Sequence, residues 1–422
     1  MGMTQVVATP DAVAAAAANG TDSIGVALYH SGTRDCAGLG STLPMALRRK
    51  LSQAPSHAAW DFLSIALAVF AADRFVMRSE AEDSWTRVIH LDVALADPGV
   101  WQLNTQRLAS AFRFLTGDIW SLNFRAGGQS RPTMQGRFTD RDCVCLFSGG
   151  LDSLLGAISL QQANRRPLLV SQGSPKEITP QKYLATALGL ENHRFEGRVS
   201  ERWRPPYEPS TRARSVLFFA YGLVAASAMG VSEVIVPENG LIAINPPFTR
   251  RRTGSLSTRT THPHFLRELS AIWADVGLAV SLRNPFATRT KGEMMADANI
   301  PNLRQLAKES YSCGKGKRLN RQCGRCVPCL IRRAAFQSAG VIDDTRYRWN
   351  DLTQSARADD VLATRMAVAR FDQMHDQRDM ERWAAMAGPL PRDNATRDAL
   401  VAAVGRGVEE LKQFLATVQW PS

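Results

Sequence analysis

The sequence has few lysines for a chain of its charge. Only eight of its 51 basic residues are lysine, so arginine carries almost all of the formal net charge of +12. Arginine binds phosphates, nucleic acids and carboxylates alike. Because no block of about five or six like charges is present, the sequence shows no nucleic-acid-binding arm. The charge alone therefore assigns no partner, and a bias in composition explains it equally well.

Targeting and membrane signals are also absent. Residues 1–20 are rich in alanine but have no basic stretch ahead of an apolar core, so we expect no secretory signal peptide. The longest uncharged stretch, Ser215–Val231, contains glycine and serine and precedes a strand pattern. It favours a buried helix over a membrane span. We expect a soluble, cytoplasmic protein.

The composition is that of a globular protein, with 45% hydrophobic and 21% charged residues over 422 positions. Residues 1–130 mix helix and strand patterns and end in a Gly/Ser/Pro-rich linker, which predicts an accessory α+β domain. Residues 139–309 alternate short apolar strands with helices, which predicts a doubly wound parallel α/β sheet. Residues 310–335 form a cysteine module, and 340–422 are expected to be helical.

The expected elements can be given by their residues. In the first region they are a helix at 60–75, a strand at 87–94, a helix at 101–115 and a strand at 119–124. In the second, strands are expected at 143–147, 168–171, 193–195, 233–236 and 279–282, and helices at 151–162, 180–188, 212–229 and 264–276. Residues 1–130 contain no catalytic constellation. Asp73, Arg74 and Arg78 suit a partner surface or a solvated helix end equally well.

The most informative motif runs from Ser148 to Ser153. The segment Ser-Gly-Gly-Leu-Asp-Ser follows a buried strand pattern and opens a helix pattern. Glycines let the backbone approach an anion, and a helix N-terminus adds unpaired N–H donors and a positive dipole end. The order strand, glycine turn, helix therefore predicts a phosphate-binding loop made of Ser148, Gly149, Gly150, Leu151, Asp152 and Ser153, rather than a merely structural turn.

Four of the seven cysteines cluster near residue 320. Cys313, Cys323, Cys326 and Cys329 have the spacing C-x9-C-x2-C-x2-C. Such spacing lets four thiolates surround one ion, and all-protein ligation predicts a closed, structural Zn²⁺ site. An iron–sulfur cluster is the alternative. The other cysteines, Cys36, Cys143 and Cys145, are expected to be core residues or otherwise unrelated.

Basic residues surround the cysteine cluster. They suit binding of a nucleotide, an acidic partner or RNA, and solvation of the loop explains them as well. They are Lys315, Lys317, Arg318, Arg321, Arg325, Arg332 and Arg333.

Together, the phosphate loop and the cysteine cluster resemble a known family. The loop resembles the SGGxDS motif of N-type ATP pyrophosphatases, and its combination with the cysteines resembles the 7-cyano-7-deazaguanine synthase (QueC) family. Ala213–Phe218 and Asn284–Glu293 resemble further segments of that family, so the resemblance covers about residues 140–335. It implies a PP-loop (HUP-type) fold.

Several features depart from the family pattern. The first cysteine gap is one residue longer, Ser215 stands where the family has Asn, and the family's substrate loop is absent. Here Pro237-Glu238-Asn239-Gly240 ends the strand, and a basic loop with Arg250–Arg252 and Thr258–His264 follows. Together with the extra length, these changes resemble the enlarged QatC type of antiphage defence operons.

The resemblance implies a reaction and roles for named residues. ATP would be split to AMP and pyrophosphate to activate 7-carboxy-7-deazaguanine, and an amine would then give the amide, or in a second round the nitrile. The loop would bind the phosphates, and Mg²⁺ would reconcile Asp152 with their charge. Lys291 and Arg214 would face the α-phosphate, or be ordinary ion-paired residues. Glu238 and Asn239 would bind the deazaguanine, or cap a turn.

The acceptor is left open by the sequence. Our hypothesis is that a protein amine of an operon partner replaces ammonia. A second reading is a PP-loop enzyme that adenylates a base in tRNA or DNA, and a third is a non-catalytic scaffold. Oligomerisation is compatible with each reading.

Overall fold

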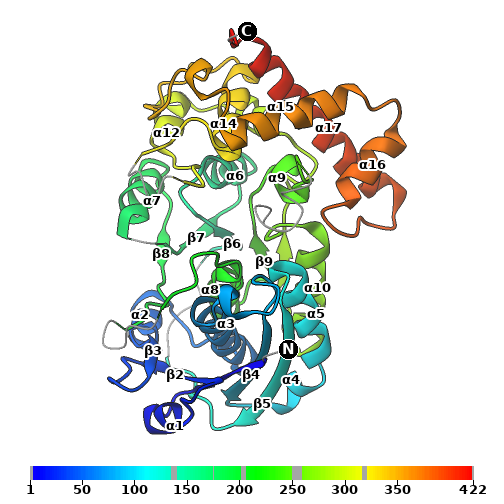
Figure 1. Cartoon of the computed structure of the whole chain (residues 1–422). Coiled ribbons are helices and arrows are strands. Elements are labelled where there is room, and N and C mark those ends of the chain that lie inside the picture. The colour runs from blue at the N-terminus through cyan, green and yellow to red at the C-terminus, as the bar shows by residue number, and fades with distance from the viewer. Residues whose placement is uncertain are drawn as a thin grey trace. The chain divides into compact units, whose positions relative to one another are not determined.

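The computed structural model describes residues 3–134, 140–173, 175–200, 206–249, 259–315 and 321–420. By internal contacts the chain forms two compact units, and each is assembled from separate segments. Unit 1 comprises 1–144, 193–234 and 267–282, and unit 2 comprises 145–192, 235–266 and 283–422. Figure 1 labels their elements. The four regions expected from the sequence follow chain order and remain a prediction.

Unit 1 contains a parallel five-stranded sheet. Its strands are β1 (Met3–Thr9), β2 (Ser23–His30), β3 (Ala37–Gly40), β4 (Val88–Leu95) and β5 (Ile119–Ala126), in the order β3-β2-β1-β4-β5. Each neighbouring pair is parallel. The expected α+β class for residues 1–130 is therefore wrong, and this part is α/β. The sequence pattern missed β1, β2 and β3, and β1 is the strand that joins the two halves of the sheet.

Helices complete unit 1. They are α1 (Ala12–Ala17), α2 (Leu43–Lys50), α3 (His57–Phe75), η1 (Arg78–Glu80), α4 (Gly99–Gln102), α5 (Thr105–Thr116), α8 (Arg214–Met229) and residues 267–275 of α10 (Pro263–Asp275). Helix α3 is buried along most of its length, because strands of the sheet and α8 both pack against it. Phe62 of α3 contacts Trp101 and Trp273 with ring centroids 5.7 and 5.2 Å apart.

A second five-stranded sheet carries the phosphate loop. Its strands are β6 (Cys143–Leu146), β7 (Pro167–Ser171), β8 (Asn192–Arg194), β9 (Glu233–Ile235) and β10 (Ser281–Arg283), in the order β10-β9-β6-β7-β8. Helices α6 (Leu151–Gln162) and α7 (Pro175–Ala187) connect β6 to β7 and β7 to β8. This order confirms the doubly wound sheet. It reverses between β6 and β9, where such sheets bind ligands beyond the carboxyl ends of their strands.

The rest of unit 2 is helical. Its elements are α9 (Gly240–Ile244), α11 (Lys291–Ala296), α12 (Leu303–Glu309), α14 (Val327–Ser338), η3 (Thr353–Ser355), α15 (Asp359–Asp372), α16 (Gln377–Ala385) and α17 (Asn394–Ala416). The expected C-terminal helices are thus confirmed. Helix α17 packs against α9, α14, α15 and α16 (Figure 1). Trp383 of α16 is fully buried and donates to the Pro247 carbonyl over 3.0 Å.

Candidate active site

The loop after β6 has the shape expected of an anion-binding turn. Gly149 has φ +79°, a conformation that favours glycine, and Gly150 is the N-cap of α6 without a side-chain cap. The exposed Ser148 accepts the Gly150 N–H over 3.2 Å, and its Oγ lies 3.2 Å from Ser153 Oγ. Two hydroxyls and the first turn of a twelve-residue helix therefore converge, as phosphate binding requires.

Three residues that the sequence analysis missed support this loop. Gln181 of α7 donates to the Ser148 carbonyl over 3.1 Å, and a Cβ at Gly149 would meet its side chain at 3.0 Å. The Tyr311 N–H donates to the Gly149 carbonyl over 2.8 Å, and Ser312 Oγ accepts the Leu151 N–H over 3.1 Å. The only available signal was position, since Tyr311 and Ser312 directly precede Cys313. The cysteine module thus begins on the phosphate loop.

Asp152 is the centre of a charged cluster. Its Oδ2 pairs with Lys291 Nζ over 2.7 Å, and the Lys291 side chain is 2% exposed. Its Oδ1 accepts from Asn239 Nδ2 over 2.8 Å and from the Asn239 N–H over 3.3 Å. These residues come from the starts of α6, α11 and α9. The structure therefore brings together three residues that lie far apart in the sequence, and Lys291 compensates the charge that Asp152 adds to the phosphate loop.

Glu238 lies beside this cluster. Its Oε1 accepts from Asn239 Nδ2 over 3.3 Å, and its carbonyl accepts from Asn284 Nδ2 over 2.8 Å. Burial, followed by the charge of Asp152, raises the pKa of Glu238 well above its ordinary value, and Lys291 opposes the shift. Burial beside a second carboxylate therefore favours the protonated, neutral form of Glu238. A neutral Glu238 can donate a hydrogen bond as well as accept one.

Asn239 has the capping role that the sequence left as an alternative. It is the N-cap of α9, its Oδ1 accepts the Ile242 N–H over 3.2 Å, and it is 0% exposed. Its side-chain amide therefore already forms hydrogen bonds within the protein. The buried side chain holds Asp152 in place, and the proposed contact with a deazaguanine rests on Glu238 alone.

Arg214, the other expected catalytic cation, is the first residue of α8 and belongs to unit 1. The start of its helix is fixed by an acidic residue of α3. Asp73 Oδ2 accepts the N–H groups of Arg212 and Ala213, each over 2.6 Å. A carboxylate at this position supplies the cap that the α8 N-terminus otherwise lacks.

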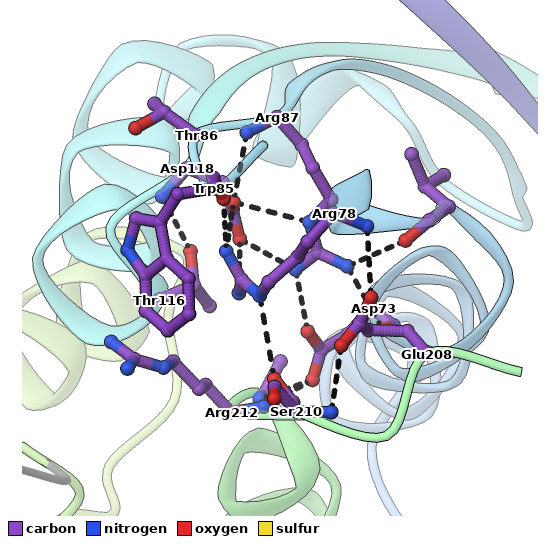
Figure 2. Close-up of polar contacts among 12 residues, drawn as sticks. Asp73, Arg78, Trp85, Thr86, Arg87, Thr116, Asp118, Glu208, Ser210 and Arg212 are labelled. Atoms are coloured by element: carbon purple, nitrogen blue, oxygen red, sulfur yellow. Dashed lines mark hydrogen bonds and ion pairs between the residues drawn. The ribbon is translucent and has the colours of Figure 1, made fainter. Parts of the chain in front are cut away.

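Asp73 belongs to a buried ion network within unit 1 (Figure 2). Its Oδ1 pairs with Arg87 over 2.7 Å, and Arg87 pairs with Asp118 over 2.6 Å. Asp118 in turn accepts both guanidinium nitrogens of Arg78, over 2.8 and 3.1 Å. These four residues are at most 3% exposed. Both readings given from the sequence for Asp73 and Arg78, a partner surface and a solvated helix end, are therefore wrong.

The same network fixes the chain before α8. Glu208 accepts the Arg78 N–H over 2.8 Å and the Ser210 N–H over 2.7 Å, as Figure 2 shows. Arg74 stacks over the Tyr207 ring at 4.1 Å. The network is thus a structural anchor for residues 207–213.

The cysteine cluster fits a tetrahedral ion. The four Sγ atoms all lie within 4.8 Å of one another, with Cys313–Cys326 at 3.8 Å and Cys323–Cys329 at 3.9 Å. A tetrahedral Zn²⁺ with Zn–S bonds of about 2.3 Å separates its sulfurs by about 3.8 Å. Cys323 Sγ also accepts the N–H groups of Arg325 and Cys326. All four side chains are buried, so the cluster could hold zinc as a closed structural site. Cys36, Cys143 and Cys145 are buried elsewhere, as expected for core residues.

Several basic residues near the cysteines have structural partners. The buried Arg332 donates to Ser310 Oγ over 2.7 Å, and Arg333 donates to the carbonyls of Gly324 and Asn350. Arg325 stacks on Trp349 at 3.7 Å. Lys315 pairs with Asp360 over 2.5 Å. Lys317 and Arg318 lie outside the described residues, as do Arg250–Arg252.

Within the described part of the chain, no helix is long and apolar enough to cross a membrane.

Comparison with known proteins supports the family resemblance. A family model described as queuosine biosynthesis protein QueC matches residues 260–340. A protein named 7-cyano-7-deazaguanine synthase from Novosphingobium aromaticivorans is 28% identical over 234 residues, which cover 48% of this chain and 93% of the relative. Proteins with the same name from Syntrophobacter fumaroxidans and Agrobacterium fabrum are 24% and 28% identical, with coverage of 49% and 52% of this chain and 96% and 98% of each relative.

These matches confirm the resemblance to the QueC enzymes, a PP-loop family of ATP-using carbon–nitrogen ligases. The relatives align with about half of this chain. Its length of 422 residues is consistent with the enlarged QatC-like type.

Proposed function

We propose that this QueC-like chain uses ATP to adenylate the carboxylate of 7-carboxy-7-deazaguanine. The observation that carries the proposal is the cluster at the reversal of the second sheet, where Lys291, Asp152 and Glu238 adjoin the phosphate loop. A glycine turn alone would suit many phosphate ligands. A buried lysine beside a carboxyl group of raised pKa suits a reaction in which negative charge develops.

In the proposed first step, a carboxylate oxygen of the substrate attacks the α-phosphorus of ATP. The bond from that phosphorus to the bridging oxygen breaks, pyrophosphate leaves, and an acyl-adenylate forms. The loop hydroxyls of Ser148 and Ser153 and the first N–H groups of α6 would bind the phosphates. Lys291 would stabilise the developing charge, and Arg214 is proposed as a second cation.

Mg²⁺ fits the donor set that Asp152 offers. Carboxylate oxygens are the ligands that Mg²⁺ prefers, and when bound with ATP it would neutralise charge on the leaving pyrophosphate. Zn²⁺ at the four cysteines would have no part in the chemistry. It would hold the segment from Tyr311 to Cys329, whose first residue bonds to Gly149.

In the proposed second step, an amine attacks the acyl carbon and AMP leaves, which gives an amide. We propose that the amine belongs to a partner protein, in a cytoplasmic antiphage defence system of the QatC type. The extra length supports this, because ammonia needs no docking surface and about half of the chain lies outside the matched relatives.

The test is to incubate the full chain with ATP, Mg²⁺ and 7-carboxy-7-deazaguanine, first with ammonium and then with the products of neighbouring genes. The proposal expects AMP and pyrophosphate, and a mass increase on a partner protein. Asp152→Asn and Lys291→Met should abolish AMP formation, while Lys412→Met, which alters an exposed pair with Asp372, should not. Absence of AMP under every combination would overturn the adenylation. Formation of the free nitrile alone, with every partner present, would overturn the protein acceptor.

The second reading, modification of a nucleic-acid base, has its own test. Filter binding of tRNA and DNA at two salt concentrations would reveal it, because binding through phosphates weakens steeply with salt. AMP release that depends on RNA or DNA would favour this reading over the small-molecule substrate.

A further inference from the structure

The C-terminal helix α17 contacts both segments that bring side chains to Asp152. Ala403, Arg406, Gly407 and Glu410 have the spacing i, i+3, i+4 and i+7, which places them on one face of a helix. A Cβ on Gly407 would lie 3.0 Å from the Leu241 side chain of α9, and a Cβ on Gly240 would lie 2.8 Å from Ala403. This face therefore packs closely on α9, which begins directly after Asn239.

Further along the same face, Glu410 reaches the start of α11. Its carboxylate accepts the hydroxyl of Thr290 and lies 3.4 Å from the Gly292 N–H, so it bonds on both sides of Lys291. Thr290 is also the N-cap of α11, where its Oγ1 accepts the Glu293 N–H over 3.0 Å. A continuous chain of hydrogen bonds thus runs from the first turn of α11 to α17.

Packing at this point is close. A Cβ on Gly292 would lie 2.3 Å from the Glu410 carboxylate and 2.9 Å from Ser338 of α14. Ser338 Oγ also donates to Glu410 over 3.4 Å. Four residues earlier on α17, Arg406 pairs with Glu293 over 2.5 Å and donates to the Thr288 carbonyl over 2.9 Å. Helix α11 has only six residues, so these bonds rather than its own length fix its direction.

We propose that Glu410 is a positioning residue of the ATP site, and that it fixes the direction from which Lys291 reaches Asp152. Only helices were expected for residues 340–422, and this assigns α17 a role in the reaction. The inference rests on the proposed function of Lys291. Glu410 is 8% exposed, and its carboxylate is occupied by Thr290, Gly292 and Ser338. It therefore acts through Lys291 and has no direct part in the chemistry.

The test compares four variants for ATP-dependent pyrophosphate release and for the unfolding midpoint. Glu410→Ala removes the acceptor, and Glu410→Asp withdraws it by one methylene. Glu410→Gln keeps one oxygen for the Gly292 N–H, and its NH₂ group can donate to the hydroxyls of Thr290 and Ser338. Glu409→Ala is the matched control, because the adjacent Glu409 side chain bonds to Gln413 on the exposed side of α17. Each variant is assayed at a temperature where it is fully folded.

We expect Glu410→Ala and Glu410→Asp to lower kcat by about tenfold to a hundredfold, the scale of a small misplacement, and to raise KM for ATP by about tenfold. Glu410→Gln should restore kcat to within about threefold, because hydrogen bonding rather than charge positions the helix. If Glu410→Ala does not fold, Glu410→Asp is compared with the wild type instead. Unchanged kcat in the shortened variants, or an equal loss in Glu410→Gln, would overturn the proposal.

The proposed function and the positioning role of Glu410 can be refuted separately. If the wild-type chain binds ATP but releases no pyrophosphate, adenylation is refuted. The effect of Glu410 on the position of Lys291 is then measured by calorimetry, as a change in ATP affinity. Glu410→Ala should then bind ATP about tenfold more weakly than the wild type and Glu410→Gln should not. Equal ATP affinity in the wild type and both variants, or no ATP binding by any of the three proteins, would overturn the role of Glu410.

Discussion

Replacing Asp118 by asparagine should strongly destabilise unit 1. The Asp118 carboxylate accepts five hydrogen bonds from Arg78 and Arg87, at 2.6 to 3.2 Å. Asparagine has nearly the same shape, but its NH₂ group would face guanidinium donors where an oxygen now accepts. The substitution also removes the carboxylate that pairs with the buried Arg78 guanidinium and leaves Arg87 with its pair to Asp73.

The magnitude follows from burial. Asp118 is 0% exposed, and removing one partner of a buried ion pair costs about 3–5 kcal/mol of unfolding free energy. Asp275→Asn is the control, because Asp275 pairs with Arg107 on the surface of the same unit, with side chains 49% and 42% exposed. An exposed pair of this kind contributes about 0–1 kcal/mol. Urea unfolding at neutral pH, followed by tryptophan fluorescence, measures both differences.

The pH dependence gives an independent check. Burial opposes ionisation of Asp118, but hydrogen bonds and charge from Arg87, followed by those of Arg78, lower its pKa below the ordinary value of 3.8. A lowered folded pKa means that this stabilisation is present above 3.8 and is lost as the pH falls through the folded pKa. The gap between wild type and Asp118→Asn should therefore be constant from pH 7 to about pH 5 and shrink in stronger acid. A cost below about 1 kcal/mol, or a gap that widens in acid, would refute the reasoning.

Three further predictions concern the candidate site and the cysteine cluster. Lys291→Met should lower the rate of pyrophosphate release by about a hundredfold or more, since it removes the cation beside Asp152; a rate within threefold of wild type would contradict this. The raised pKa of Glu238 means that its contribution to stability is fully present below the ordinary value of 4.5 and is lost as the pH rises through the folded pKa. The unfolding midpoint of Glu238→Gln, which cannot ionise, should therefore rise relative to that of the wild type as the pH increases above about 5, and a constant difference would refute this. Cys326→Ser should lose the bound zinc measured by mass spectrometry while Cys36→Ser retains it, and retention in both would exclude the four-cysteine site.

Local patterns were sufficient for much of the fold. The helix expected at 151–162 is α6 with those bounds, and the strand at 143–147 differs from β6 by one residue. Both belong to strongly apolar segments separated by the turn at Gly149-Gly150, where short-range signals are clear. The strands β1 and β2 were missed because their alanine- and glycine-containing segments carry little alternation, and pairing with each other and with β4 stabilises them.

Some residues of the candidate site could likewise be predicted from local sequence, and others could not. Ser148–Ser153 and the four cysteines were predicted from spacing, because each motif gathers its chemistry within a short segment. The pairing of Lys291 with Asp152 joins residues 139 positions apart; the family resemblance assigned both residues to the ATP site but did not predict that they pair. The supporting residues Gln181 and Glu410 had no local signal, because a polar residue in such a segment is as well explained by solvent exposure.

Local sequence therefore specified a glycine turn between strand and helix, a cluster of four cysteines that could hold a metal ion, and a chain of alternating α/β elements. Each is recognised from patterns in short segments of the chain, which the order of amino acids specifies directly. Tertiary structure decided that Asp73 and Arg78 are buried ion partners, that Asn239 is a cap, and that α17 contacts the turn carrying Lys291. These depend on which segments exclude water from each other, and burial changes the charge, hydrogen bonding and role of a residue without changing its identity.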